Sequence, residues 1–231
     1  MTQTGLAFSI DEDLVRISTE DAASICKAAD LNEEALALLH PDDRTVDYLE
    51  RLLHAKQYVE ALTFLAHGLP KREAVWWACA ALQRWLGDGL SEPDRQALAV
   101  VENWIYDPSQ DLCRAAGDIA AEGKFQTPAA LVAASVYWAG SSIAPPDCPA
   151  VPPGEHLTNK AVAHALILVS MREADPSARQ GAVEFFLAMG VKIAQGLTSR
   201  AALESVQGGS ALRPDSSHSA HTHMNASGSE R

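Results

Sequence analysis

Glu50 and His54 lie four residues apart, a spacing that places both side chains on one face of a helix, and Asp47 lies one turn earlier. A carboxylate beside an imidazole fixes the tautomer of the ring, so this pair could act as the base of a small-molecule hydrolase or transferase. The alternative is an exposed helical pair that adds only about 0.2–0.5 kcal/mol to helix stability. We favour the exposed pair.

Other catalytic and metal-binding patterns are missing from the sequence. It has no Gly-rich phosphate loop, no GxSxG, no HExxH and no CxxC. The four cysteines are far apart, and His164 falls inside an apolar run where it is expected to be buried. His218, His221 and His223 could chelate a metal loosely, but they have no acid or thiol beside them. We therefore expect no catalytic residue, no metal site and no cofactor, and a protein that is not an enzyme.

The densest feature is the segment PKREAVWWAC at residues 70–79. Adjacent residues on a helix point about 100° apart, so a helix that buries only one face cannot cover both tryptophans. The apolar run from Ala74 to Leu82 favours a central position for this helix. A tryptophan left at the boundary, next to two cations in the first turn, would suit a partner surface. The candidate binding residues are therefore Lys71, Arg72, Trp76 and Trp77.

Residues that start and end helices recur along the whole chain. Ser, Thr, Asp and Asn precede runs with apolar residues at helical spacing, and Gly or Pro follows them. The predicted helices cover about residues 18–29, 32–39, 43–53, 58–67, 70–86, 91–106, 109–123, 127–138, 159–174, 175–195 and 200–207. Alternating strand patterns are missing, and residues 6–17 are the one candidate for an extended arm.

The fold class expected is all-α. Three segments are apolar nearly all round, at residues 74–82, 129–139 and 161–170, and such helices must be surrounded by others. This predicts a compact bundle of about ten helices. A short two-layer α-solenoid is the alternative, although no fixed repeat is visible.

One helical domain is expected over residues 1–207. Within it, residues 141–157 form a Pro-rich loop, with prolines at 146, 149 and 152 in the spacing of a polyproline II ligand. Residues 208–231 are rich in Ser, Gly and His and nearly free of large apolar side chains, which predicts a disordered C-terminal tail.

The formal net charge of −12 restricts the classes of partner. An acidic surface repels phosphate backbones and anionic lipid headgroups, so we expect neither nucleic acid nor a membrane surface. It suits a basic protein, although many proteins are acidic for solubility alone. The uncharged stretch from residue 125 to 146 is too rich in Ala, Ser and Gly for a spanning helix. No secretory signal is visible at the N-terminus, so the cytoplasm is the expected location.

The block PKREAVWWAC, preceded by YVEALTFLAHGL, resembles the signature of an uncharacterised bacterial family of helical proteins. The resemblance extends in layout over about residues 17–189 and is specific over 58–82. That family is associated with type VI secretion gene neighbourhoods. The resemblance implies a cytoplasmic accessory protein, an adaptor or chaperone for a secreted component.

The function expected from the sequence is that of a non-enzymatic protein–protein interaction module. One alternative is an immunity-type protein that neutralises a toxin through its acidic surface. The other is a hydrolase or transferase that uses His54 with Glu50. The sequence leaves the oligomeric state open.

Overall fold

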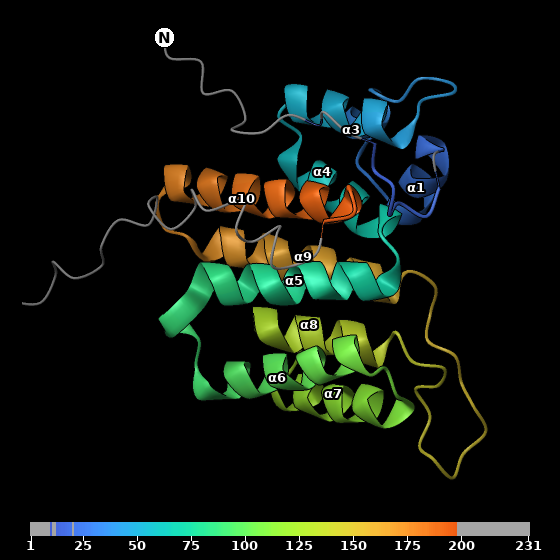
Figure 1. Cartoon of the computed structure of the whole chain (residues 1–231), viewed down its shortest axis with the longest axis vertical. Helices are drawn as coiled ribbons and strands as arrows, with labels where there is room; N and C mark the ends of the chain where they lie inside the picture. Colours follow the sequence, from blue (N-terminus) through green and yellow to red (C-terminus); the bar gives the residue numbers. More distant parts are fainter. Residues whose placement is uncertain (1–9, 11–12, 20, 198–231) are drawn as a thin grey trace, which may run out of the picture.

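The computed structural model describes residue 10, residues 13–19 and residues 21–197, and these form a bundle of α-helices (Figure 1). No strand occurs among the described residues, where the one β-type pairing is an isolated bridge between Asp21 and Arg44. The all-α prediction is confirmed. The predicted helix over 200–207 and the predicted disordered tail over 208–231 lie outside the described residues.

Eight of the ten described helices begin and end within two residues of the predicted bounds, whereas α1 and α2 are shorter than predicted. The helices are α1 Ala22–Ala29, α2 Glu33–Leu36, α3 Thr45–His54, α4 Tyr58–Gly68, α5 Lys71–Leu86, α6 Glu92–Tyr106, α7 Gln110–Glu122, α8 Pro128–Tyr137, α9 Leu157–Arg172 and α10 Pro176–Ala194, with a 3-10 turn at Gly87–Gly89. Polar side chains cap five of the predicted starts by accepting a bond from a backbone N–H of the first turn. These caps are Asn32, Ser91, Ser109, Thr127 and Asp175.

The start of α1 differs from the prediction. Ser18 was expected to cap this helix, but its hydroxyl donates to the Gly68 carbonyl at 2.9 Å. Asp21 caps α1 instead and accepts from the backbone N–H groups of Ala23 and Ser24. The Ser18 side chain therefore attaches the N-terminal segment to the end of α4.

The three helices predicted to be surrounded by others lie at the centre of the bundle. α9 packs against α4, α5, α8 and α10, and α8 in turn packs against α5, α6 and α7. Figure 1 shows α1 and α3 beyond α4 at one end of the molecule, and α6 and α7 below α8 at the other. Alanine is frequent in α5, α8 and α9, and its small side chain lets these helices approach closely.

Residues 138–156 connect α8 to α9 as a long loop that projects from the bundle (Figure 1). Gln110 of α7 fixes its base, because its Nε2 donates to the Ser142 carbonyl at 2.8 Å and its Oε1 accepts from the Ser141 N–H at 2.9 Å. The buried Ser142 hydroxyl accepts from the Val151 N–H at 3.0 Å and so joins the two sides of the loop. The expected Pro-rich loop is thus tethered at its base.

Among the described residues, no helix is both long enough and apolar enough to cross a membrane.

Candidate interaction groove

A cavity with a volume of about 470 Å³ lies between α5 and α6. We call it the α5–α6 groove. Most of one wall comes from α5, the opposite wall comes from the second half of α6, and one residue comes from the N-terminal segment. The lining residues are Arg16, Arg72, Glu73, Trp76, Cys79, Ala80, Gln83, Glu102, Ile105 and Tyr106.

The two adjacent tryptophans of α5 point in different directions. Trp77 is fully buried, and its indole N–H donates to the Phe186 carbonyl of α10 at 2.9 Å. Trp76 is half-buried and lines the groove. Trp77 therefore belongs to the core and not to a surface, whereas Trp76 keeps part of its side chain open to solvent.

Arg72 has a structural partner that the sequence did not reveal. Its Nε donates to the Ile105 carbonyl at 2.7 Å and its Nη2 to the Tyr106 carbonyl at 3.4 Å. These carbonyls end α6, where the helix dipole favours a cation. The cation that is unfavourable at the start of α5 is thus placed at the C-terminus of a neighbouring helix. Lys71 is exposed and does not line the groove.

Charged groups lie at both ends of the groove. Arg16 Nη1 and Glu73 Oε1 form an ion pair at 3.6 Å, and the side chains are 35% and 26% exposed. Gln83 Nε2 donates to Glu102 Oε1 at 2.9 Å. The hydrogen-bond partners of Arg72 are backbone carbonyls and that of Glu102 is a side-chain amide, so neither is paired with an opposite charge through these bonds.

The apolar part of the groove includes a highly exposed aromatic ring. Tyr106 lies in the last turn of α6, beside Ile105, and is 82% exposed to solvent. Trp76 lines the opposite wall of the groove. Large apolar side chains that stay open to solvent in this way are typical of contact surfaces when they cluster.

The comparison with protein families decides the family of the chain. A model described as a family of unknown function, DUF6931, matches residues 48–194, which is well over half of the chain. The chain belongs to this family. No curated protein and no solved structure is significantly similar to it.

Membership in DUF6931 confirms the expectation of an uncharacterised family. The matched span contains both helices that wall the groove, and the expected binding residues 71, 72, 76 and 77 fall within it. Arg16 lies before it. The association with type VI secretion stays a prediction.

The groove offers no activated nucleophile within the described residues. Cys79 is the one cysteine that lines it, and burial, together with the negative charge of Glu102, raises the pKa of its thiol. The thiol therefore stays protonated at neutral pH and behaves as a small apolar side chain. Across residues 10, 13–19 and 21–197, no three His, Cys, Asp or Glu side chains come together as a metal site would require.

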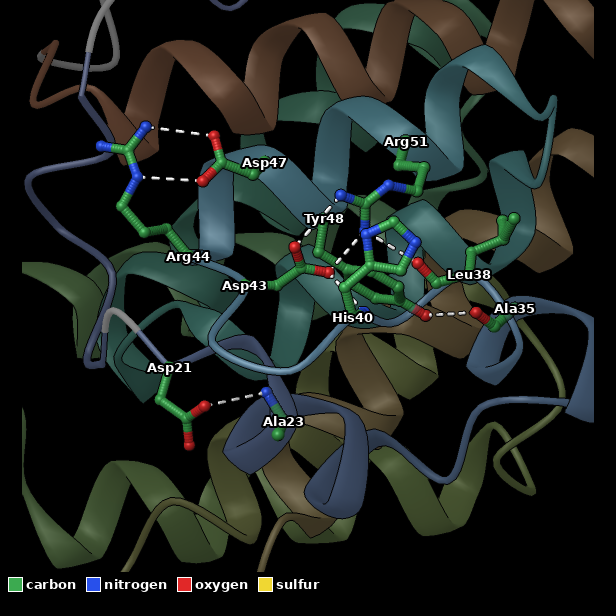
Figure 2. Close-up of polar contacts among 10 residues, drawn as sticks. All are labelled: Asp21, Ala23, Ala35, Leu38, His40, Asp43, Arg44, Asp47, Tyr48 and Arg51. Carbon is green, nitrogen blue, oxygen red and sulfur yellow. Dashed lines mark hydrogen bonds and ion pairs between the residues drawn. The ribbon is translucent and has the colours of Figure 1, made fainter.

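The Glu50–His54 pair lies on α3, away from the groove. His54 is exposed, and no hydrogen bond or ion pair joins it to Glu50 in the described part of the chain. Asp47, one turn earlier, is held by Arg44, whose Nε donates to Asp47 Oδ2 at 2.9 Å (Figure 2). This hydrogen bond lowers the pKa of the Asp47 carboxyl. Asp47 therefore pairs with Arg44 and does not orient His54.

A second polar cluster near α3 secures the connection from α2 (Figure 2). The Arg51 guanidinium binds both oxygens of Asp43 and donates to the Leu38 carbonyl at 2.8 Å. The pairing with Arg51 lowers the pKa of Asp43. The Tyr48 hydroxyl donates to the Ala35 carbonyl at 2.8 Å from inside the core. These bonds join the α2–α3 connection to α3, so we assign the cluster to folding.

Two histidines differ from the sequence-based expectation. His164 was expected inside an apolar helix, but it is exposed on α9. His67, which the sequence did not single out, is 8% exposed near the end of α4. Its Nδ1 is 2.8 Å from the Thr63 carbonyl and must be the donor, which leaves Nε2 buried without a partner. Burial lowers the pKa of His67.

Proposed function

We propose that the protein is a non-enzymatic interaction module that binds a protein partner in the α5–α6 groove. The observation that carries this proposal is the combination of an exposed Tyr106, a half-buried Trp76 and a cavity of about 470 Å³ between them. Tyr, Trp and Arg dominate the energetics of protein interfaces, and all three line this groove.

The charges of the groove indicate the chemistry of the partner. Arg72 and Glu102 are residues of opposite charge type at separate positions, both hydrogen-bonded to neutral groups, and Trp76, Cys79 and Ala80 line the wall between them. A fitting partner presents an apolar helix face or loop that carries an acid near Arg72 and a base near Glu102. The role that the sequence resemblance implies, an adaptor or chaperone in bacterial secretion, is part of this proposal.

The test is capture of partners by groove variants. Tyr106→Ala removes an exposed ring and should leave folding intact, whereas Ala80→Arg fills the groove, because Ala80 lines it and is 8% exposed. Met171→Ala is the matched control, since Met171 is an exposed apolar residue in the last turn of α9 and does not line the groove.

Each tagged variant is used for cross-linked capture from the native host, with quantitative mass spectrometry and a thermal melt of the same preparation. We expect a protein that the parent and Met171→Ala retain and that both groove variants lose at least about tenfold, equal to 1.4 kcal/mol of binding energy. Equal capture by all four chains would refute the proposal. A secretion component as the captured partner would assign the adaptor or chaperone role, and a toxin would assign the immunity role.

A further inference from the structure

The chain leaves the described structure beside the groove. The C-terminal end of α10 is attached to the N-terminal segment, because the Arg16 N–H donates to the Ala194 carbonyl at 2.8 Å. Arg16 Nη2 also donates to the Gly196 carbonyl at 3.4 Å, while Nη1 of the same guanidinium pairs with Glu73 Oε1 at 3.6 Å. A single guanidinium therefore separates Gly196 from the wall of the α5–α6 groove. Leu197, the last described residue, directly follows Gly196.

We propose that residues 198–207 of this chain, with the sequence TSRAALESVQ, occupy the α5–α6 groove when no partner is bound. This rests on the proposed function, because it makes the segment an internal competitor of the partner. The segment is the first one after the described structure, so no long linker has to be ordered for it to reach the groove.

The composition of the segment matches the groove. Ala202, Leu203 and Val206 have the spacing of one helical face and supply the apolar contact that Trp76 and Tyr106 require. The charged residues of the segment, Arg200 and Glu204, differ in sign. The groove offers each an oppositely charged counterpart, since the hydrogen bonds of Glu102 and Arg72 go to neutral groups. Residues 208–231 lack such an apolar face and are therefore not the occupant.

Because residues 198–207 are covalently attached next to the groove, weak contacts are enough to keep them bound in it. A segment attached next to its site has an effective concentration of about a millimolar, so even modest affinity keeps the groove largely filled. A partner must displace the segment. The apparent affinity for the partner is therefore the intrinsic affinity multiplied by the fraction of chains whose groove is open. Loss of the apolar residues of the segment should therefore strengthen partner binding.

Disulfide trapping in the full-length chain tests the proposal directly. Cys148 is the one exposed cysteine among the described residues, and Cys148→Ser removes it. In that background, Tyr106→Cys is combined with Val206→Cys. The first control keeps Val206→Cys and places the second cysteine at the far end of α9, as Met171→Cys. The second control keeps Tyr106→Cys and places the other cysteine beyond the segment, as Ser216→Cys.

The measured quantity is the equilibrium between each thiol pair and its intramolecular disulfide in a glutathione buffer. We expect an effective concentration at least about tenfold higher for the 106–206 pair than for either control, and its loss on addition of Leu203→Asp. Equal values for the three pairs, or an unchanged value with Leu203→Asp, would overturn the proposal. Disulfides between two chains would overturn it as well, since they would show that a second copy fills the groove.

The same variants separate this inference from the proposed function. If trapping fails while Ala80→Arg still loses the captured partner, the internal occupant is wrong and the groove remains a binding site. If trapping succeeds while Ala80→Arg and Tyr106→Ala retain the partner, the segment fills the groove and the partner binds elsewhere.

Discussion

Trp77 and Trp76 share a helix and a residue type, but they differ in what a truncation removes. Trp77 fills the space between α5 and α10 and donates to the Phe186 carbonyl, so Trp77→Ala both opens a cavity and removes a buried hydrogen bond between the two helices. We expect this change to lower the free energy of unfolding by about 3–5 kcal/mol. Trp76→Ala should cost much less, because that ring is half-buried, and it should reduce partner capture. Urea unfolding of both variants measures the difference, and similar losses would contradict the assignment of Trp76 to a surface.

His67 makes stability depend on pH. Burial lowers its pKa in the folded state, so the folded protein binds this proton less readily than the unfolded chain does. The contribution of the neutral ring is fully present above the unfolded pKa of about 6.5 and is lost as the pH falls below it. Neighbouring groups add to the effect, since His156 just before α9 and Lys160 and His164 on α9 oppose a further positive charge.

We therefore expect the free energy of unfolding of the parent protein to fall between pH 7 and pH 5 by more than that of His67→Gln. His54→Gln is the control, because His54 is an exposed histidine on α3 and is not among the groups that perturb His67. Chemical unfolding at several pH values gives the comparison. A parent and a His67→Gln variant with the same pH profile would show that His67 does not titrate in this range.

Helical geometry predicts that Trp76 and Trp77 diverge by about 100°, but it does not predict which of them faces the core. That choice depends on α10, which supplies the Phe186 carbonyl from more than a hundred residues further along the chain. Arg72 is a similar case, because its partners are carbonyls at the end of α6. Side chains with local partners, such as the Ser91 cap, are predictable, whereas those with distant partners are not.

At the scale of the helix, the close approach of α10 to α5 and α4 depends on Gly190. A Cβ at this position would lie 2.6 Å from the Trp77 ring and 2.7 Å from Leu65, well inside van der Waals contact. Alanine would favour the isolated helix by about 1 kcal/mol, so a loss of stability must come from packing. We expect Gly190→Ala to destabilise the protein by about 1–3 kcal/mol because the buried ring has no room to move.

Gly89→Ala is the control for the added methyl group without a clash, since Gly89 lies in the 3-10 turn and a Cβ there would meet nothing within 4 Å. Thermal unfolding of the two variants side by side isolates the steric term. If Gly190→Ala melts at the same temperature as the parent or higher, α10 and α5 must be able to separate without cost, and the packing argument would be wrong.

The existence and order of the described helices follow from the sequence because their caps and apolar stripes are local. The start of α1 was predicted wrongly because the Ser18 hydroxyl has a better acceptor in Gly68, fifty residues away. The apolar character of α5, α8 and α9 predicted that these helices are central. It did not predict which helices surround them. Composition thus predicts that a helix is central, and pairing between distant elements determines its neighbours.

At the scale of the whole molecule, the groove is a product of tertiary structure. Its walls are consecutive helices, but one end is closed by Arg16, which reaches Glu73 across most of the first third of the chain. The sequence pointed to the first two turns of α5 and missed Ile105, Tyr106 and Glu102 on α6. The exposed aromatic at position 106 precedes Asp107 and Pro108, a helix-ending signal that gave no indication of a binding surface.

The segment 208–231 should contribute nothing to the stability of the helical bundle. Its charged residues, Arg213, Asp215, Glu230 and Arg231, cancel, so its removal leaves the acidic balance of the rest of the chain unchanged. It also has few large apolar side chains with which to offset the entropy of ordering. A chain that ends at Gln207 should melt within about 1 °C of the full chain, because a loss of 1 kcal/mol would shift the midpoint by about 2–4 °C in a protein of this size.

Replacement of 208–231 by a Gly/Ser segment of equal length controls for the tether itself. A drop of several degrees in the shortened chain, rescued by the native segment but not by the Gly/Ser replacement, would show that residues beyond 207 make specific contacts with the bundle.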